Sequence, residues 1–162
     1  MALTATSALW FLPFVLPICI WVAWSDMKFM KIPNKAVLAL LGVFLIVGLI
    51  ALPFTGYLWR LPHIVVILAI GFVANMAGLL GAGDAKFAAA MAPFVALGDA
   101  VLFMYLFAAA LLAAFAVHRI FRAIPAVRRA TPQWASWTSR KFPMGLALGS
   151  SLAFYLLAGV LR

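Results

Sequence analysis

Residues 100–117 read AVLFMYLFAAALLAAFAV, a run that contains no charged side chain. A helix that crosses the hydrocarbon core of a bilayer needs roughly 20 apolar residues, so this stretch predicts a membrane-spanning helix. The whole chain has the same character, because 69% of its 162 residues are hydrophobic and its mean hydropathy is +1.20. Soluble domains are only about half apolar. We therefore expect an integral membrane protein.

Five further apolar runs lie along the chain. Solid apolar blocks favour helices over the weak alternation of a strand barrel. We expect an all-α membrane protein in which about six transmembrane helices form a single integral membrane domain over residues 1–162. The predicted spans are 7–24, 36–52, 61–80, 85–97, 100–117 and 143–161. The fourth is short, reaching only about 20 Å at 1.5 Å per residue. No basic residue precedes Lys28, so we expect the first span not to be a cleaved secretory signal.

The basic residues predict the orientation of this bundle. Ten of the twelve fall in the loops after the first, third and fifth runs, which share one side of the membrane. By the positive-inside rule that side is cytoplasmic and both termini lie outside. The net charge of +9 therefore indicates topology, and we expect no nucleic-acid partner. The ten residues are Lys28, Lys31, Lys35, Lys86, Arg119, Arg122, Arg128, Arg129, Arg140 and Lys141.

The chain has only three acidic residues, Asp26, Asp84 and Asp99. Asp26 and Asp84 each stand at the end of an apolar run, on the predicted cytoplasmic side. A carboxylate near a membrane core is costly and usually has a functional reason. Asp99 follows Gly98 on the opposite side, where we expect a plain turn or helix cap whose change to Asn is nearly silent.

A pair of carboxylates allows two chemistries. One aspartate can take a proton from water while the other protonates the substrate, which hydrolyses a peptide bond. Gly81 and Gly83 beside Asp84 would let an extended substrate backbone come close. The alternative is a small transporter that couples ions or protons through the same pair, and the residues alone favour neither.

Other chemistries fit poorly. The single cysteine, Cys19, cannot form an internal disulfide, and His63 and His118 are not spaced as metal ligands, so we expect no metal and no cofactor. The glycine segment fits neither nucleotide motif, because Lys86 stands where a dinucleotide fingerprint needs glycine and Asp84 where a P-loop needs lysine.

Three stretches, in this order, carry a resemblance to a known family. They are Asp26 followed by basic residues and Ile32-Pro33-Asn34, then Gly81-Ala82-Gly83-Asp84-Ala85-Lys86, then the segment 142–149 with its Pro143 and Gly145. At these residues the chain resembles type IV prepilin peptidases, membrane aspartyl proteases marked by Gly-x-Gly-Asp. The resemblance implies that Asp26 and Asp84 are the catalytic pair. It implies a supporting role for Lys31, Pro33, Asn34, Gly81, Gly83, Lys86, Pro143 and Gly145.

The resemblance also implies the reaction. Members cleave the leader of prepilin or pseudopilin precursors at the cytoplasmic face of the bacterial inner membrane, typically after a glycine. The chain looks like the short, peptidase-only members that serve Flp/Tad pili, because it lacks the paired Cys-x-x-Cys insert, and no methyltransferase activity is expected. The resemblance does not identify the precursor or the oligomeric state.

Two further expectations concern the cytoplasmic side. The basic loop 118–141, with Trp134 and Trp137, could bind anionic membrane lipid or a partner, and we favour a role as an anchor of the orientation. Asp26 is predicted at a negative helix C-terminus and Asp84 at a positive helix N-terminus. That difference predicts that Asp84 ionises first and serves as base, while Asp26 holds the proton.

Overall fold

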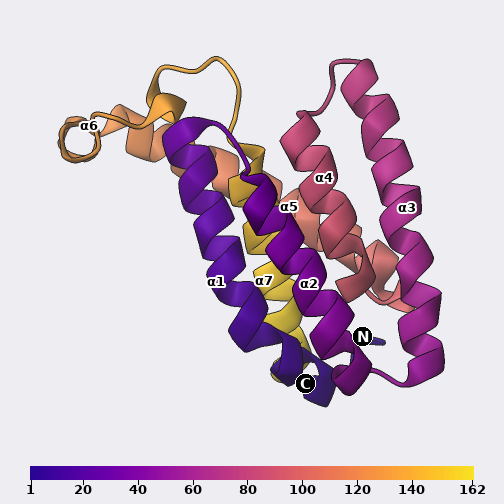
Figure 1. The fold of residues 1–162 in the computed structure, drawn as a ribbon. Coiled ribbons are helices and arrows are strands. Elements are labelled where there is room, and N and C mark those ends of the chain that lie inside the picture. The colour runs from indigo at the N-terminus through magenta and orange to yellow at the C-terminus, as the bar shows by residue number, and fades with distance from the viewer.

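The computed structural model describes all 162 residues, and it contains helices and no strands (Figure 1). The all-α prediction is therefore confirmed. The main helices are α1 (Ala5–Phe29), α2 (Asn34–Ala51), α3 (Phe54–Met76), α4 (Ala82–Met91), α5 (Ala100–Ala123), α6 (Pro125–Ala130) and α7 (Met144–Val160). Short 3-10 turns η1 (Ala92–Phe94), η2 (Leu97–Asp99) and η3 (Ala135–Trp137) lie between them.

Four segments are long and apolar enough to cross a membrane: α1, α2, α3 and the stretch Leu97–Ala123 that contains α5. Helix α7 is also apolar but shorter, with 17 residues. The chain is thus a multi-pass helical protein, and the total of six spans stays a prediction.

Helix α4 differs from its predicted limits of 85–97. It begins at Ala82, inside the glycine segment, and ends after ten residues at Met91. Pro93 follows within η1, and a proline there cannot donate the next helical hydrogen bond. Arg60 Nη1 of α3 binds the carbonyl oxygens of Pro93 and Phe94 at 3.1 and 3.0 Å. Ten residues reach only about 15 Å, so α4 is a half-length helix set among longer ones.

The loops group by the two ends of the bundle. The α1–α2 connection, the α3–α4 connection and the α6 segment lie at one end, while both termini and the α2–α3 connection lie toward the other (Figure 1). This is the grouping that the charges predicted, and it collects the basic residues at the end that carries α6. Which end faces the cytoplasm stays a prediction.

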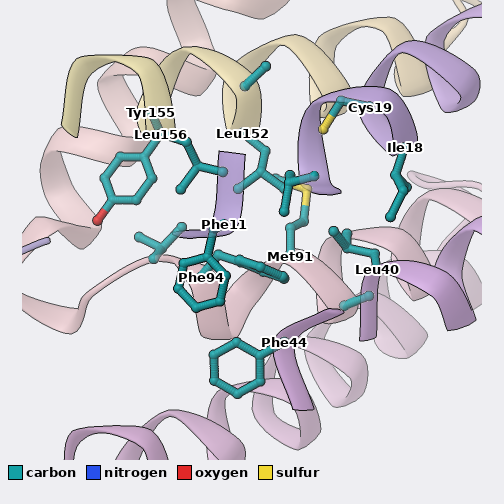
Figure 2. Packing of buried hydrophobic residues seen from close by; sticks show 14 of the residues in the cluster. Phe11, Ile18, Cys19, Leu40, Phe44, Met91, Phe94, Leu152, Tyr155 and Leu156 are labelled. Carbon is teal, nitrogen blue, oxygen red and sulfur yellow. The ribbon is translucent and has the colours of Figure 1, made fainter. Parts of the chain in front are cut away.

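The core holds α1, α2, α4 and α7 together. Phe11 packs edge-on against Phe94 with ring centroids 4.9 Å apart, and Phe44 lies 5.4 Å from Phe94, with Met91 beside them (Figure 2). Helix α7 comes close to α1 through its glycines, since a Cβ at Gly149 would lie 2.8 Å from the carbonyl oxygen of Cys19. Small residues at a helix interface permit this approach in membrane proteins.

Asp99 is not the plain cap that was expected. It is buried, and its side chain makes no capping bond to the first turn of α5. Its carboxylate accepts hydrogen bonds from the N–H groups of Ala2 and Leu3, at 2.6 and 3.0 Å, and from the hydroxyl of Tyr155 at 2.8 Å. Asp99 therefore ties the N-terminal segment to α7 at the end opposite α6.

Candidate active site

Asp26 lies in the last turn of α1, and its side chain is buried. The helix ends because Met30 adopts the left-handed conformation, with φ at 53°, and donates its N–H to the carbonyl of Asp26 at 2.8 Å. The Asp26 carboxylate accepts a 2.7 Å hydrogen bond at Oδ2 from the N–H of Gly145 in α7. This bond joins residues 119 positions apart in the sequence.

Gly145 is the second residue of α7 and follows the buried Pro143 and the half-buried Met144. A Cβ at this position would lie 2.9 Å from Cβ and 3.0 Å from Oδ2 of Asp26. No larger residue fits there without moving Asp26. The segment 142–149 therefore brings the free N–H groups of a helix N-terminus against a carboxylate, where they stabilise negative charge.

Asp84 is the third residue of α4 and is half-buried. Its Oδ2 accepts the N–H of Gly81, the residue that precedes the helix, at 3.2 Å. The preceding turn is held by Gly78, whose φ of 74° suits glycine, and by Asn75, whose side chain donates to the carbonyl of Leu80 at 2.7 Å. The glycine segment thus forms a fixed turn that presents Asp84 at the end of the bundle.

Both aspartates line one cavity of about 290 Å3. The α1–α2 loop covers the first turn of α4, and Ile32 Cβ would lie 3.4 Å from a Cβ at Gly83. Lys86 of α4 donates to Asn34 Oδ1 of α2 at 3.4 Å, which joins the two sequence motifs. The lining residues are Asp26, Met30, Lys31, Ile32, Asn34, Gly81, Ala82, Gly83, Asp84 and Lys86.

The structure therefore brings together most of the residues that the sequence singled out. Two prolines stand just outside the cavity. Pro33 precedes the first residue of α2 and Pro143 precedes the first residue of α7, so each starts a helix whose next residues reach the site. Whether these residues act in catalysis stays a prediction.

A model of the type IV leader peptidase family matches residues 13–117. The chain belongs to this family. It is a peptidase of the aspartic type, a prepilin-type leader peptidase whose substrates are prepilin-like. No curated protein and no solved structure matches the chain. The matched residues of this leader peptidase include Asp26 and Asp84, and Gly145 lies beyond them.

The surroundings of Asp84 favour its protonated form. Burial, and then the nearby carboxylate of Asp26, raise the pKa of Asp84 to about 6, while the Gly81 N–H and the Lys141 ammonium lower it. Lys141 does not line the cavity, and its electrostatic link to Asp84 was not predicted from the sequence. Its position two residues before Pro143, in the motif that starts α7, was the available signal.

The predicted positions of the aspartates at opposite helix ends are confirmed, but a further contact weakens the difference between them. Asp84 does lie at the positive N-terminus of α4 and Asp26 at the negative C-terminus of α1. However, Asp26 also faces the positive N-terminus of α7 through Gly145. Each carboxylate therefore meets a helix N-terminus, so the dipole argument, which considered only the helix that carries each aspartate, is incomplete, and which aspartate holds the proton stays a prediction.

Part of the segment 118–141 of the leader peptidase is buried. Trp137 is buried, its indole Nε1 donates to the carbonyl and hydroxyl oxygens of Thr131 at 3.1 Å, and its ring stacks on His118 at 5.3 Å. Trp134 stacks on Trp137 with centroids 5.6 Å apart. Trp137 is thus part of the loop's own packing, and the role of the loop as an anchor stays a prediction.

Proposed function

We propose that this chain cleaves the leader from prepilin or pseudopilin precursors at the cytoplasmic face of the bacterial inner membrane, with Asp26 and Asp84 as its catalytic pair. The observation that carries this proposal is that the two aspartates, from α1 and α4, line one cavity at the end of a chain that belongs to the leader peptidase family. Family membership favours this function over the transporter alternative.

The mechanism follows from the hydrogen bonds of the pair, because the bond from Gly145 to Asp26, at 2.7 Å, is shorter than the bond from Gly81 to Asp84, at 3.2 Å. Asp26, which accepts the short bond from Gly145, acts as the base, and Asp84 carries the proton. Asp26 takes a proton from water, and the water oxygen bonds to the carbonyl carbon of the scissile peptide. Asp84 gives its proton to the carbonyl oxygen. When the intermediate collapses, the C–N bond breaks, the leaving nitrogen takes the proton that Asp26 received from water, and a hydroxyl of the gem-diol returns a proton to Asp84 as the carbonyl forms again.

The cavity also supports a substrate in extended form. Gly81 and Gly83 carry no side chain, so the backbone of a peptide can approach Asp84 closely. The single cysteine of the chain, Cys19, is buried in α1. With no paired cysteines for a zinc-binding insert, we propose that the enzyme is a peptidase only, of the kind that serves Flp/Tad pili.

Co-expression with candidate precursors tests the proposal, with cleavage read as a mobility change on a gel. Asp26→Asn and Asp84→Asn should each abolish cleavage while the variant still enters the membrane fraction. Cleavage should persist in the presence of a chelator, because the proposed mechanism uses no metal. Full activity in Asp84→Asn, or loss of wild-type activity in chelator, would contradict it.

A further inference from the structure

Helix α3 carries a single residue of the Lys, Arg, Asp or Glu type, and that residue is Arg60. It lies in the first half of a helix that is long and apolar enough to cross a membrane, and it is half-buried. An arginine inside such a segment is costly and usually has a functional reason. Arg60 forms no ion pair with an aspartate. Its Nη1 donates instead to the carbonyl oxygens of Pro93 and Phe94, at 3.1 and 3.0 Å.

The two carbonyls belong to η1, the turn that follows α4 directly. Pro93 and Phe94 are both fully buried. The last carbonyls of a helix have no partner within the helix, and a proline cannot supply the next N–H. In a membrane interior no water replaces a missing donor. The guanidinium of Arg60 therefore satisfies backbone groups that the early end of α4 would otherwise leave unpaired, and it attaches that end to α3.

A second contact joins the same two helices beside Asp84. Helices α3 and α4 pack side by side (Figure 1). A Cβ at Gly71 of α3 would lie 2.8 Å from the Cβ of Ala85, the residue after Asp84. Small residues of this kind set how closely two helices approach. They do not fix how far α4 lies along α3, whereas hydrogen bonds weaken steeply when their geometry changes, so the bonds from Arg60 do fix it.

The height of Asp84 in the bundle thus depends on the opposite end of its helix. Asp84 and Pro93 are separated by about 13 Å along the helix axis, at 1.5 Å per residue. A helix this short transmits an axial shift from one end to the other. Asp26 is held independently, by the N–H of Gly145. Because both aspartates line one cavity, a shift of α4 changes the position of one carboxylate and not of the other.

We propose that Arg60 is a positioning residue of the peptidase, and that it fixes the height of Asp84 relative to Asp26 by holding the far end of α4. This rests on the proposed function. Arg60 does not line the aspartate cavity, so it acts through α4 alone. A displacement of about 1 Å at a reacting group can cost about a hundredfold in rate, even when the substitution lies far from it. Loss of Arg60 should therefore lower kcat and leave KM nearly unchanged.

The first test measures precursor cleavage by the folded, full-length enzyme in detergent. Arg60→Met should lower kcat by about tenfold or more and change KM by less than about twofold. Arg60→Lys should restore much of the rate, because an ammonium can still donate to the carbonyls. His63→Leu is the matched control, since His63 is also half-buried and lies one turn further along α3, and it should change neither constant.

Two kinetic outcomes would overturn the proposal. One is an unchanged kcat in folded Arg60→Met, which would leave Arg60 with a role in stability only. The other is a rise in KM alone, which would place Arg60 in precursor binding. If Arg60→Met does not fold, Arg60→Gln, which keeps an amide donor, is measured in its place against the same expectations.

Disulfide formation measures the position of α4 without turnover. In a Cys19→Ala background, Ile32→Cys and Gly83→Cys should cross-link, because a Cβ at Gly83 would lie 3.4 Å from that of Ile32. This is close to the roughly 3.5–4.5 Å found in disulfides. The bond should form about fivefold or more slowly when Arg60→Met is added, and at the original rate with His63→Leu. An unchanged rate with Arg60→Met would overturn the proposal. Absence of cleavage by the wild type would refute the proposed function instead, and the cross-linking result would still stand.

Discussion

The N–H of Gly145 donates a 2.7 Å hydrogen bond to Oδ2 of Asp26, joining the last helix of the chain to the first at the rim of the site. The bond depends on the absence of a side chain at position 145, and this gives the first prediction.

Gly145→Ala should reduce precursor cleavage at least about tenfold, because a Cβ there would lie 2.9 Å from Asp26 and force the carboxylate to shift. The variant should still enter the membrane. The matched control is Gly42→Ala in α2, where a Cβ would meet nothing within 4 Å, and it should cleave like the wild type. Equal activity of the two variants would contradict the role of Gly145.

The rate of cleavage should fall as the pH rises through about 6. The pKa of Asp84 is raised to about 6, so at higher pH the pair loses the proton that the mechanism gives to the substrate. The initial rate at pH 8 should be lower than at pH 6 by about tenfold or more. The pH dependence of the rate reports the titration of Asp26 and Asp84 together. NMR titration of carboxyl-labelled Asp84 in detergent should show its transition near pH 6, and a transition below 4 would contradict the assignment of the proton.

Lys141→Gln should move the alkaline limb of this profile upward. The Lys141 ammonium lowers the pKa of Asp84, so its removal raises that pKa and keeps the proton to higher pH. The side chain is exposed, which limits the shift to about half a pH unit or less. Arg140→Gln, one residue away, is the control and should leave the profile in place. A downward shift in Lys141→Gln would contradict the sign.

Asp99→Asn should destabilise the protein, whereas the sequence alone predicted a nearly silent change. The buried carboxylate accepts two backbone N–H bonds and the Tyr155 hydroxyl, and an amide cannot accept all three equally. We expect a loss of about 1–3 kcal/mol in the free energy of unfolding, read as a lower midpoint in thermal unfolding in detergent. Tyr155→Phe should lower it too. Unchanged midpoints in both would contradict the network.

The predicted orientation can be tested by labelling. Cysteines at Lys31 and Arg128 should react with impermeant thiol reagents only in inverted vesicles, and one at Thr55 only from outside. The native Cys19 is buried and should not interfere. The reverse pattern would place the site on the opposite face and exclude a cytoplasmic substrate route.

The sequence predicted the parts of this site that depend on local chemistry. Asp26 and Asp84 stand out because a carboxylate at the end of an apolar run is costly, and the breaks beside them follow from residues such as Pro33 and Gly81. These features are local and need no knowledge of packing. For the same reason the all-helical class could be predicted from apolar runs such as 100–117.

Two of the features that sequence reasoning missed depend on tertiary contacts, and the third, the length of α4, depends on a local proline. Asp99 has the sequence context of a cap, but the packing of the N-terminal segment and Tyr155 gives it other partners. The dipole argument considered only the helix that carries Asp26, whereas the N-terminus of α7 faces it from 119 residues away. Helix α4 is shorter than its apolar run because Pro93 ends it.

The link between Asp26 and Gly145 also bears on how the enzyme matures. A chain is made from its N-terminus, so both aspartates leave the ribosome well before Gly145 does. Until the final helix has inserted beside α1, the Asp26 carboxylate lacks the N–H that holds it in position. A nascent or truncated chain that ends at residue 117 therefore contains both aspartates but not the bond that sets their geometry. The proposed function therefore predicts that such a chain does not cleave a precursor until α7 packs against α1.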